Sequence, residues 1–209
     1  MLATVPEARD RRVRRSRAAL MRAAITLVTT RGTAAVPLSD IAESADVSRQ
    51  VVYQQFGDRD ALLLEAALDL ARRELLPRLM GGPPPAAAGR SRALAMAQHF
   101  AEHRAFYRAM MTGSSGFALN KALTGLMIPF NRQVVHEVLG EGLDPGVAED
   151  LASYLTGGWG AFINTWVVEG TDPLDPEGFT DRLMQLMSVL TTAMRPPTTL
   201  GTPDSEDRR

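Results

Sequence analysis

Residues 39–57 read SDIAESADVSRQVVYQQFG, and this stretch decides how the N-terminal part of the chain folds. Its first half carries apolar residues at the spacing of one helix face: Ile41, Ala42 and Ala45. A second helix is predicted from Ser48, a residue type that caps helices well, to Phe56. Only Asp46 and Val47 separate the two segments, so we expect two short helices joined by a tight turn.

A longer helix precedes this pair and is predicted from Ser16 to Thr30, with Gly32 as its C-cap. Its apolar stripe comprises Leu20, Ala24, Leu27 and Val28. The next helix should follow Pro37, with Ser39 as a candidate N-cap. Three helices with a very short turn before the third form the geometry that presents one helix to the major groove of DNA.

The third predicted helix has two distinct faces. Three apolar residues should pack on the first two helices: Val47, Val52 and Phe56. The opposite face is polar without being acidic and comprises Arg49, Gln50, Val51, Tyr53 and Gln54. Arg can read guanine, Gln can read adenine, and Val can contact the methyl group of thymine. This face is therefore a candidate for reading bases, or it is the solvated face that any amphipathic helix has.

The charge of the chain is unevenly distributed. The net charge is −1, but residues 1–60 carry 10 basic and 7 acidic residues, which gives +3. The basic excess lies in an N-terminal arm in which Asp10 is the opposing acid: Arg9, Arg11, Arg12, Arg14, Arg15 and Arg17. Such an arm suits phosphate binding, and it also suits a solvated terminus.

Composition disfavours several classes of protein. The chain has no Cys, which excludes disulfides and thiolate metal sites. No apolar run approaches the ~18 residues of a membrane span, and the N-terminus is charged where a secretory signal is apolar, so we expect a cytoplasmic protein. No Gly-rich phosphate loop, G-x-S-x-G motif or Ser/His/Asp set is evident, so we expect neither an enzyme nor a cofactor.

One enzymatic alternative rests on residues 99–103, His-Phe-Ala-Glu-His, which match the H-x-x-E-H pattern of inverted zinc peptidases. In that pattern His99 and His103 share a helix face and hold Zn²⁺. A five-residue match arises easily by chance, and no clear third ligand follows. A zinc-dependent hydrolase using His99, Glu102 and His103 is therefore a remote alternative, and our main expectation is that no metal is bound.

Helical spacing continues along the chain without strand-like alternation, so the fold should be all-α. Asp58, Asp144 and Asp175 are expected to cap helices. The later helices are predicted from Asp58 to Pro77 and over residues 91–111, 117–139 with a bend at Pro129, 145–169 and 176–194. The Gly81-Gly82-Pro83-Pro84-Pro85 stretch should be a linker or loop.

Residues at fixed intervals in the first helices carry a family resemblance: Ala23-Ala24, Gly32, Ile41-Ala42, Val47-Ser48, Tyr53, Phe56, Arg59 and Leu62. They resemble the N-terminal helix-turn-helix of the TetR family of one-component regulators. Asp46 departs from the pattern, because the family commonly has Gly there, and Asp fits only if its φ is positive. Pro37 stands where the family often has a Thr at the start of the second helix. The phosphate contact that the Thr hydroxyl would make is therefore lost, or it passes to Ser39.

The resemblance implies roles for individual positions. Tyr53 and Gln55 would contact phosphates, and Arg59, usually Lys in the family, would clamp the DNA backbone. The bases would be read by Arg49, Gln50 and Val51. The whole set predicted to contact DNA is Ser39, Ser48, Arg49, Gln50, Val51, Tyr53, Gln54, Gln55, Arg59, Arg11, Arg12, Arg14 and Arg15.

The resemblance also implies a variable C-terminal helical domain that dimerises and encloses a ligand pocket. Small and apolar residues make the last two helices the dimer candidates, unless these faces serve the core of one chain: Gly157, Gly158, Gly160, Ala161, Leu183, Leu186, Met187 and Leu190. Large apolar side chains with a few polar tips are pocket candidates, or ordinary core: His99, Phe100, His103, Tyr107, Met110, Met127, Phe130, Trp159, Phe162 and Trp166.

We therefore expect a basic flexible arm over residues 1–15, a helix-turn-helix domain over 16–60, a ligand-binding and dimerisation domain over 61–195, and a disordered tail over 196–209. The expected function is a homodimeric regulator, by the family's habit a repressor, released from double-stranded operator DNA by a small apolar or aromatic ligand. The alternative is a DNA-binding regulator with a solid C-terminal core and no small-molecule ligand.

Overall fold

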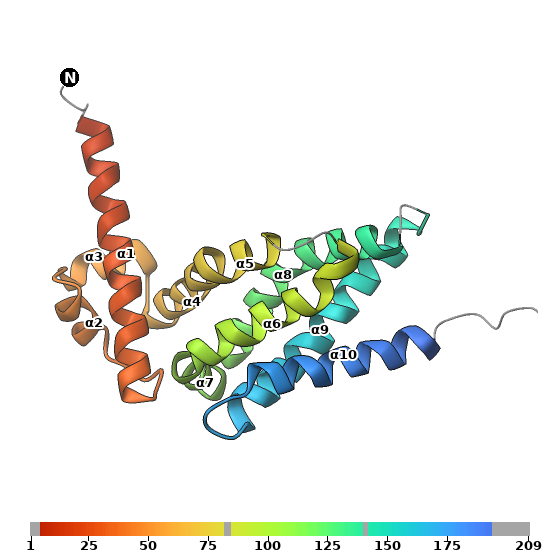
Figure 1. The fold of residues 1–209 in the computed structure, drawn as a ribbon. Coiled ribbons are helices and arrows are strands. Elements are labelled where there is room, and N and C mark those ends of the chain that lie inside the picture. Colours follow the sequence, from red (N-terminus) through yellow and green to blue (C-terminus); the bar gives the residue numbers. More distant parts are fainter. Residues whose placement is uncertain (1–4, 82–84, 140–141, 194–209) are drawn as a thin grey trace, which may run out of the picture.

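The computed structural model describes residues 5–81, 85–139 and 142–193, and every regular element in these ranges is helical. This confirms the prediction of an all-α fold. An N-terminal head of three helices is followed by a larger helical body, and Figure 1 shows α4 leading from one to the other. The hydrophobic core is continuous through both parts, because α1 packs on α4 and also on α7.

The head consists of α1 (Val5–Arg31), α2 (Leu38–Ser44) and α3 (Arg49–Phe56). Its buried centre holds apolar side chains of all three helices: Leu20, Ala24, Val28, Ile41, Ala42, Val52 and Phe56. Gly32 follows α1 with a φ of 63°. Asp46, in the turn between α2 and α3, has a φ of 53°, as its place in the motif required.

The N-terminal arm differs from the expectation of a flexible segment. Helix α1 begins at Val5 and not at Ser16, so the described part of the arm is helical. Glu, Ala and Arg, which favour helices, dominate this stretch, and Pro6 falls in the first turn, where proline is tolerated. Figure 1 shows this half of α1 projecting beyond α2 and α3.

Of the two predicted serine N-caps, the position of Ser48 is confirmed and that of Ser39 is wrong. Pro37 holds the N-cap position of α2, and the Ser39 hydroxyl, already inside the helix, donates to the Asp40 carboxylate at 3.0 Å. Ser48 does hold the N-cap position of α3, but its side chain forms no capping hydrogen bond. The Asp58 cap is confirmed, since its carboxylate accepts from the backbone N–H of Ala61 at 2.8 Å.

The helical segment predicted to end at Pro77 continues beyond that residue. It consists of α4 (Arg59–Leu70), a π-helical turn η1 (Ala71–Leu75) and α5 (Leu76–Met80). Pro77 is the second residue of α5, directly after the π-helical turn, and the helical path passes through it. Part of the predicted linker, residues 82–84, lies outside the described residues.

The remaining helices are α6 (Pro85–Glu102), α7 (Arg104–Thr112), α8 (Gly116–Leu139), α9 (Pro145–Glu169) and α10 (Pro176–Ala193). The predicted helix over 91–111 is thus divided at His103, whose φ and ψ of −109° and 22° leave the helical region. Asp144 and Asp175 accept from backbone N–H groups at the starts of α9 and α10. The predicted tail over 196–209 lies outside the described residues.

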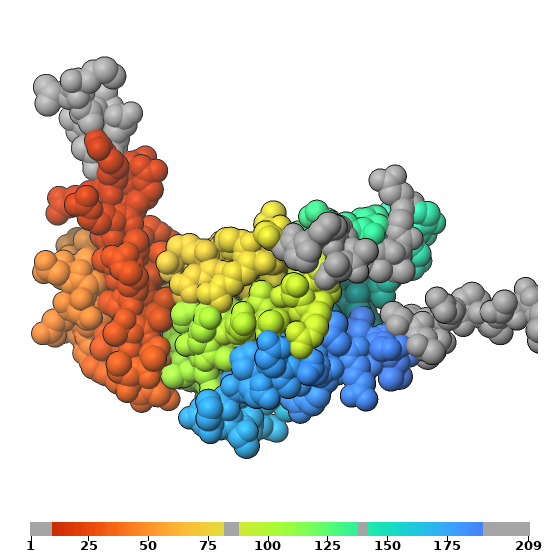
Figure 2. All heavy atoms as spheres, in the orientation of Figure 1, coloured from red at the N-terminus to blue at the C-terminus, as the bar shows by residue number. Residues whose placement is uncertain are grey.

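Helix α8 packs along α9, and α10 packs along α6. Figure 2 shows the second pair as adjoining surfaces on one face of the body. The Asn131 amide of α8 donates to the Thr156 hydroxyl of α9 at 2.7 Å. None of the helices in the described part of the chain is long and apolar enough to cross a membrane.

Asp58→Ala should lower the free energy of unfolding by about 1 kcal/mol, because an orphan N–H at the start of α4 loses its acceptor. Urea denaturation followed by circular dichroism measures the change. Asp58→Asn, which keeps an acceptor oxygen, is the matched control and should lose much less. Equal losses in both variants would show that the capping bond is not what this residue contributes.

Candidate DNA-binding surface and ligand cavity

Helix α3 presents a polar surface to solvent. The exposed residues are Arg49, Gln50, Tyr53 and Gln54, and Val51 beside them is half-buried. Tyr53 is an aromatic residue whose side chain packs little, since it is 58% exposed. Val52 and Phe56 face the core on the other side. The surface thus has the make-up of a base-reading face, with the core residues anchoring it.

Gln55, a predicted phosphate contact, faces α1 instead. Its amide donates to the Ser16 hydroxyl at 2.8 Å, and its backbone carbonyl accepts from the Arg17 guanidinium at 2.7 Å. Arg17 also pairs with Glu65 of α4 and lies over the Phe56 ring, 4.3 Å from the centroid. These contacts fix α3 against α1 and α4. Sequence reasoning counted Arg17 only as part of a basic arm and missed this structural role.

Arg59 lies at the start of α4, beside the end of α3. Its guanidinium pairs with the adjacent Asp60 at 2.9 Å, and its side chain is 35% exposed. A phosphate at this place would have to compete with Asp60 for the same cation. The arm residues Arg11, Arg12, Arg14 and Arg15 are exposed on the projecting half of α1.

The body contains a cavity of about 840 Å³. Most of its wall comes from η1, α5, α6, α8 and α9, and α7 and α10 contribute Met111 and Met187. Most lining side chains are apolar, and the polar ones are Arg92, Asn120, Thr124, Asn131, Tyr154 and Thr156. The Arg92 charge is paired with Glu137 at 3.3 Å. A cavity of this size and composition suits a small, mostly apolar molecule.

The structure brings four of the ten pocket candidates to this cavity: Phe100, Met127, Phe130 and Trp159. His99, Tyr107 and Met110 are instead fully buried in the core, and Trp166 stacks on Phe179 with ring centroids 4.3 Å apart. Phe162 faces a different hollow between α9 and α10. Aromatic and Met side chains fill helical cores as readily as they line pockets, so residue type did not separate the two.

Sequence reasoning missed most of the cavity wall, including Leu75, Met96, Asn120, Leu123 and Asn131. These are ordinary residues of amphipathic helices, and only the packing of η1, α6 and α8 against one another brings them together. Gly160, predicted as a dimer residue, also belongs to the cavity wall. A Cβ added there would lie 3.7 Å from the Asn120 side chain at the cavity wall, so this glycine faces inward and not toward a second chain.

The three residues of the H-x-x-E-H match do not converge. His99 Nε2 lies 2.9 Å from the Tyr107 hydroxyl, and His103 Nε2 lies 2.7 Å from a carboxylate oxygen of Glu74. Glu102 points elsewhere and pairs with Arg78 at 2.9 Å. The general base that a zinc hydrolase would need is therefore not beside the histidines, and that alternative has no support in the geometry.

Burial governs the ionisation of His99 and Tyr107. It lowers the pKa of His99 to about 4, so the imidazole is neutral at pH 7. It also raises the pKa of Tyr107, which stays protonated. Burial disfavours the charged form of Glu74 as well, but hydrogen bonding and the charge of His103 outweigh this and lower the pKa of Glu74.

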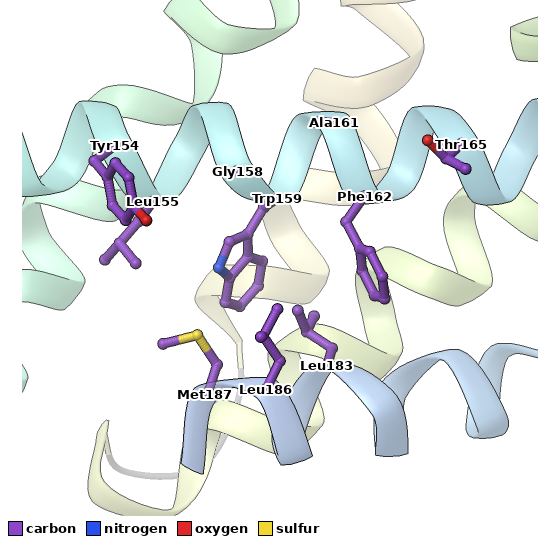
Figure 3. A pocket seen from close by; sticks show the side chains of 10 residues that line it. All are labelled: Tyr154, Leu155, Gly158, Trp159, Ala161, Phe162, Thr165, Leu183, Leu186 and Met187. Carbon is purple, nitrogen blue, oxygen red and sulfur yellow. The ribbon is translucent and has the colours of Figure 1, made fainter. Parts of the chain in front are cut away.

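Apolar residues lie exposed on α9 and α10. A second hollow, of about 420 Å³, lies between these two helices. Figure 3 shows its lining side chains, among them Trp159 and Phe162 of α9 and Leu183, Leu186 and Met187 of α10. Leu186, Val189 and Tyr154 are 45%, 61% and 69% exposed. Gly157 and Gly158 face open space. The side chain of Leu190 lies outside the described residues.

Residues 20–66 match the sequence profile of the bacterial regulatory proteins of the tetR family. This segment spans α1 from Leu20, the helix-turn-helix and the first half of α4. It contains the buried residues of the head and the exposed surface of α3. Comparison with curated proteins gives no significant match.

Solved structures with the same fold include regulators of this family. NalD of Pseudomonas aeruginosa, the secondary repressor of the MexAB-OprM multidrug efflux pump, is 23% identical, with a TM-score of 0.56 over 83% of this chain and 96% of that one. AlkX of Dietzia sp., a TetR family repressor implicated in n-alkane biodegradation, is 20% identical, with a TM-score of 0.52 over 85% and 95%.

A third structure, AibR in complex with isovaleryl coenzyme A and operator DNA, is 17% identical, with a TM-score of 0.52 over 82% of this chain and 97% of that one. These likenesses concern the fold, and the helix-turn-helix match concerns the sequence. Residues 20–66 thus carry the helix-turn-helix of the tetR family of bacterial regulatory proteins, and the described chain as a whole has the fold of solved TetR-family regulators.

Proposed function

We propose that this regulator is a homodimer that binds operator DNA through α3 and is released when a small apolar ligand fills the cavity. The observation that carries the proposal is the position of the cavity wall. Ala71, Leu75 and Leu79 line the cavity and belong to the helical path that starts at Arg59 beside α3. A ligand that displaces this wall would move the head.

The DNA-binding half rests on the exposed face of α3. Arg49, Gln50 and Gln54 are exposed and would offer paired hydrogen-bond groups to base edges, and the exposed Tyr53 would contact a phosphate. The arginines of the projecting arm would add attraction to the DNA backbone. Gln55 is withdrawn from the proposed contact set, because its side chain is occupied by Ser16.

The dimer half rests on the face that α9 and α10 expose, defined by Tyr154, Gly157, Leu186 and Val189. Exposed apolar side chains beside glycines allow close approach of a second copy of this face. In such a twofold dimer the two α3 helices would lie about 34–36 Å apart, one turn of B-DNA.

The ligand half rests on the size and apolar lining of the cavity. A regulator that answers to no small molecule would be expected to have a solid core. The printed descriptions of the similar structures point the same way, since AibR was solved with isovaleryl coenzyme A and AlkX is implicated in alkane degradation. Both NalD and AlkX are described as repressors, which favours repression here.

Selection of bound duplexes from a random pool tests the proposal and should return a palindrome. On that duplex, Arg49→Ala or Gln50→Ala should cost about 1–3 kcal/mol and relax base preference. Arg59→Ala should weaken all duplexes alike and reduce the salt slope by about one. Lys121→Ala, on α8, is the control. A change of preferred sequence in Arg59→Ala would contradict the division into base and backbone contacts.

A further inference from the structure

Three side chains with metal-binding atoms meet where η1 packs on α6. Glu74 comes from η1, His99 from α6, and His103 from the break between α6 and α7. One carboxylate oxygen and one ring nitrogen of each histidine all lie within 4.8 Å of one another. This set differs from the H-x-x-E-H motif, because Glu74, 25 residues before His99, takes the place of Glu102.

The spacing is close to what a metal ion needs. Zn–N and Zn–O bonds of about 2.0–2.1 Å in tetrahedral geometry separate ligand atoms by roughly 3.3 Å. The 2.7 Å contact between His103 and Glu74 would lengthen slightly, and the widest separation would shorten by about 1.5 Å.

His99 provides a second and independent observation. It is completely buried, and its Nδ1 has no hydrogen-bond partner in the described part of the chain. In the tautomer in which Nε2 donates to the Tyr107 hydroxyl, Nδ1 carries a free lone pair. Metal-binding histidines are usually held in this way, with the second ring nitrogen donating to a fixed acceptor. A buried, unsatisfied nitrogen costs stability unless something binds it.

We propose that Glu74, His99 and His103 bind a divalent transition-metal ion, for which Zn²⁺ is the best chemical match. Two imidazoles and one carboxylate are ligands that Zn²⁺, Co²⁺ and Ni²⁺ accept. The side chains of His103 and Glu74 are 24% and 33% exposed, which leaves an approach for the ion and room for water as a further ligand. The nearby Arg78 charge is compensated by Glu102.

The position of the site gives the metal a structural consequence. A metal bound here would tie η1 to α6, and η1 is the segment whose Ala71 and Leu75 line the cavity. Bound metal should therefore slow backbone hydrogen exchange in residues 70–80.

Titration of the full, tag-free chain with Co²⁺ tests the site, with visible absorption as the readout and Zn²⁺ as competitor. The chain has no Cys and only three His, so few other ligand sets can give a tetrahedral Co²⁺ spectrum. We expect one Co²⁺ per chain. Glu74→Gln and His103→Gln should weaken binding by more than about 100-fold, beyond the range for an outer-shell partner.

The matched controls are Glu102→Gln, inside the motif but outside the site, and His136→Gln, the remaining histidine. Both should bind Co²⁺ as the unchanged chain does. Glu74→Gln keeps a hydrogen-bonding group toward His103, and circular dichroism checks that each variant is folded. Absence of stoichiometric Co²⁺ binding, equal affinity in the Glu74 and His103 variants, or loss of binding in a control would overturn the proposal. The titration contains no DNA, so its outcome does not test the proposed binding of operator DNA.

Discussion

Leu186→Glu should convert the regulator into a folded monomer whose operator affinity is about 10²- to 10⁴-fold lower. Leu186 is 45% exposed in the single chain, so a carboxylate there costs little within one subunit. In the proposed interface the same carboxylate would be buried in an apolar setting without a partner, which is strongly unfavourable. The monomer would lose the gain in affinity that linking two half-site contacts provides.

Sedimentation equilibrium measures the oligomeric state, and fluorescence anisotropy with the selected duplex measures affinity. Phe117→Glu is the matched control, because Phe117 is an 83% exposed apolar residue on α8 and belongs to neither α9 nor α10. It should remain a dimer with unchanged operator affinity. A stable, DNA-binding dimer of Leu186→Glu would place the interface elsewhere.

The head was largely predictable from the sequence, because local signals there agree with one another. Apolar spacing marks the buried faces of α1 to α3, and the two-residue turn forces Asp46 to a positive φ. Asp58 caps α4 by accepting a hydrogen bond from the backbone N–H of Ala61, only three residues away. The errors in the head concern Ser39 and Gln55. The Ser39 hydroxyl bonds to the adjacent Asp40, and the Gln55 amide bonds to Ser16 of α1.

The body was predictable as a set of helices and not as a site. Helices 145–169 and 176–193 lie where Asp-Pro pairs and apolar spacing put them. A cavity, however, is space that the packed helices leave unfilled, and the sequence of no single helix predicts it. Gly160 and Ala161 show the limit: adjacent small residues predicted alike, one faces the cavity and the other the outer hollow.

Gly160→Phe should abolish the response of operator binding to an apolar ligand while leaving the affinity of the free protein for DNA nearly unchanged. The added ring would enter the cavity beside Asn120, where an added Cβ already makes ordinary contact at 3.7 Å. The helix itself tolerates the change, because Gly is a weaker helix former than Phe. With the cavity filled, a ligand has no differential affinity for the two states and cannot shift them.

Gly125→Phe is the matched control, since Gly125 lies on α8 and an added Cβ there meets nothing within 4 Å. Ligands come from a melting-temperature screen of the unchanged protein. For a ligand that weakens its operator binding ~10-fold, a coupling of about 1.4 kcal/mol, linkage requires ~10-fold weaker ligand binding to the operator complex. That factor should fall to about one in Gly160→Phe and persist in Gly125→Phe. A full response in Gly160→Phe would show that the ligand binds elsewhere than in this cavity. If no compound in the screen shifts the melting temperature or releases DNA, only the operator-binding half of the proposal stands.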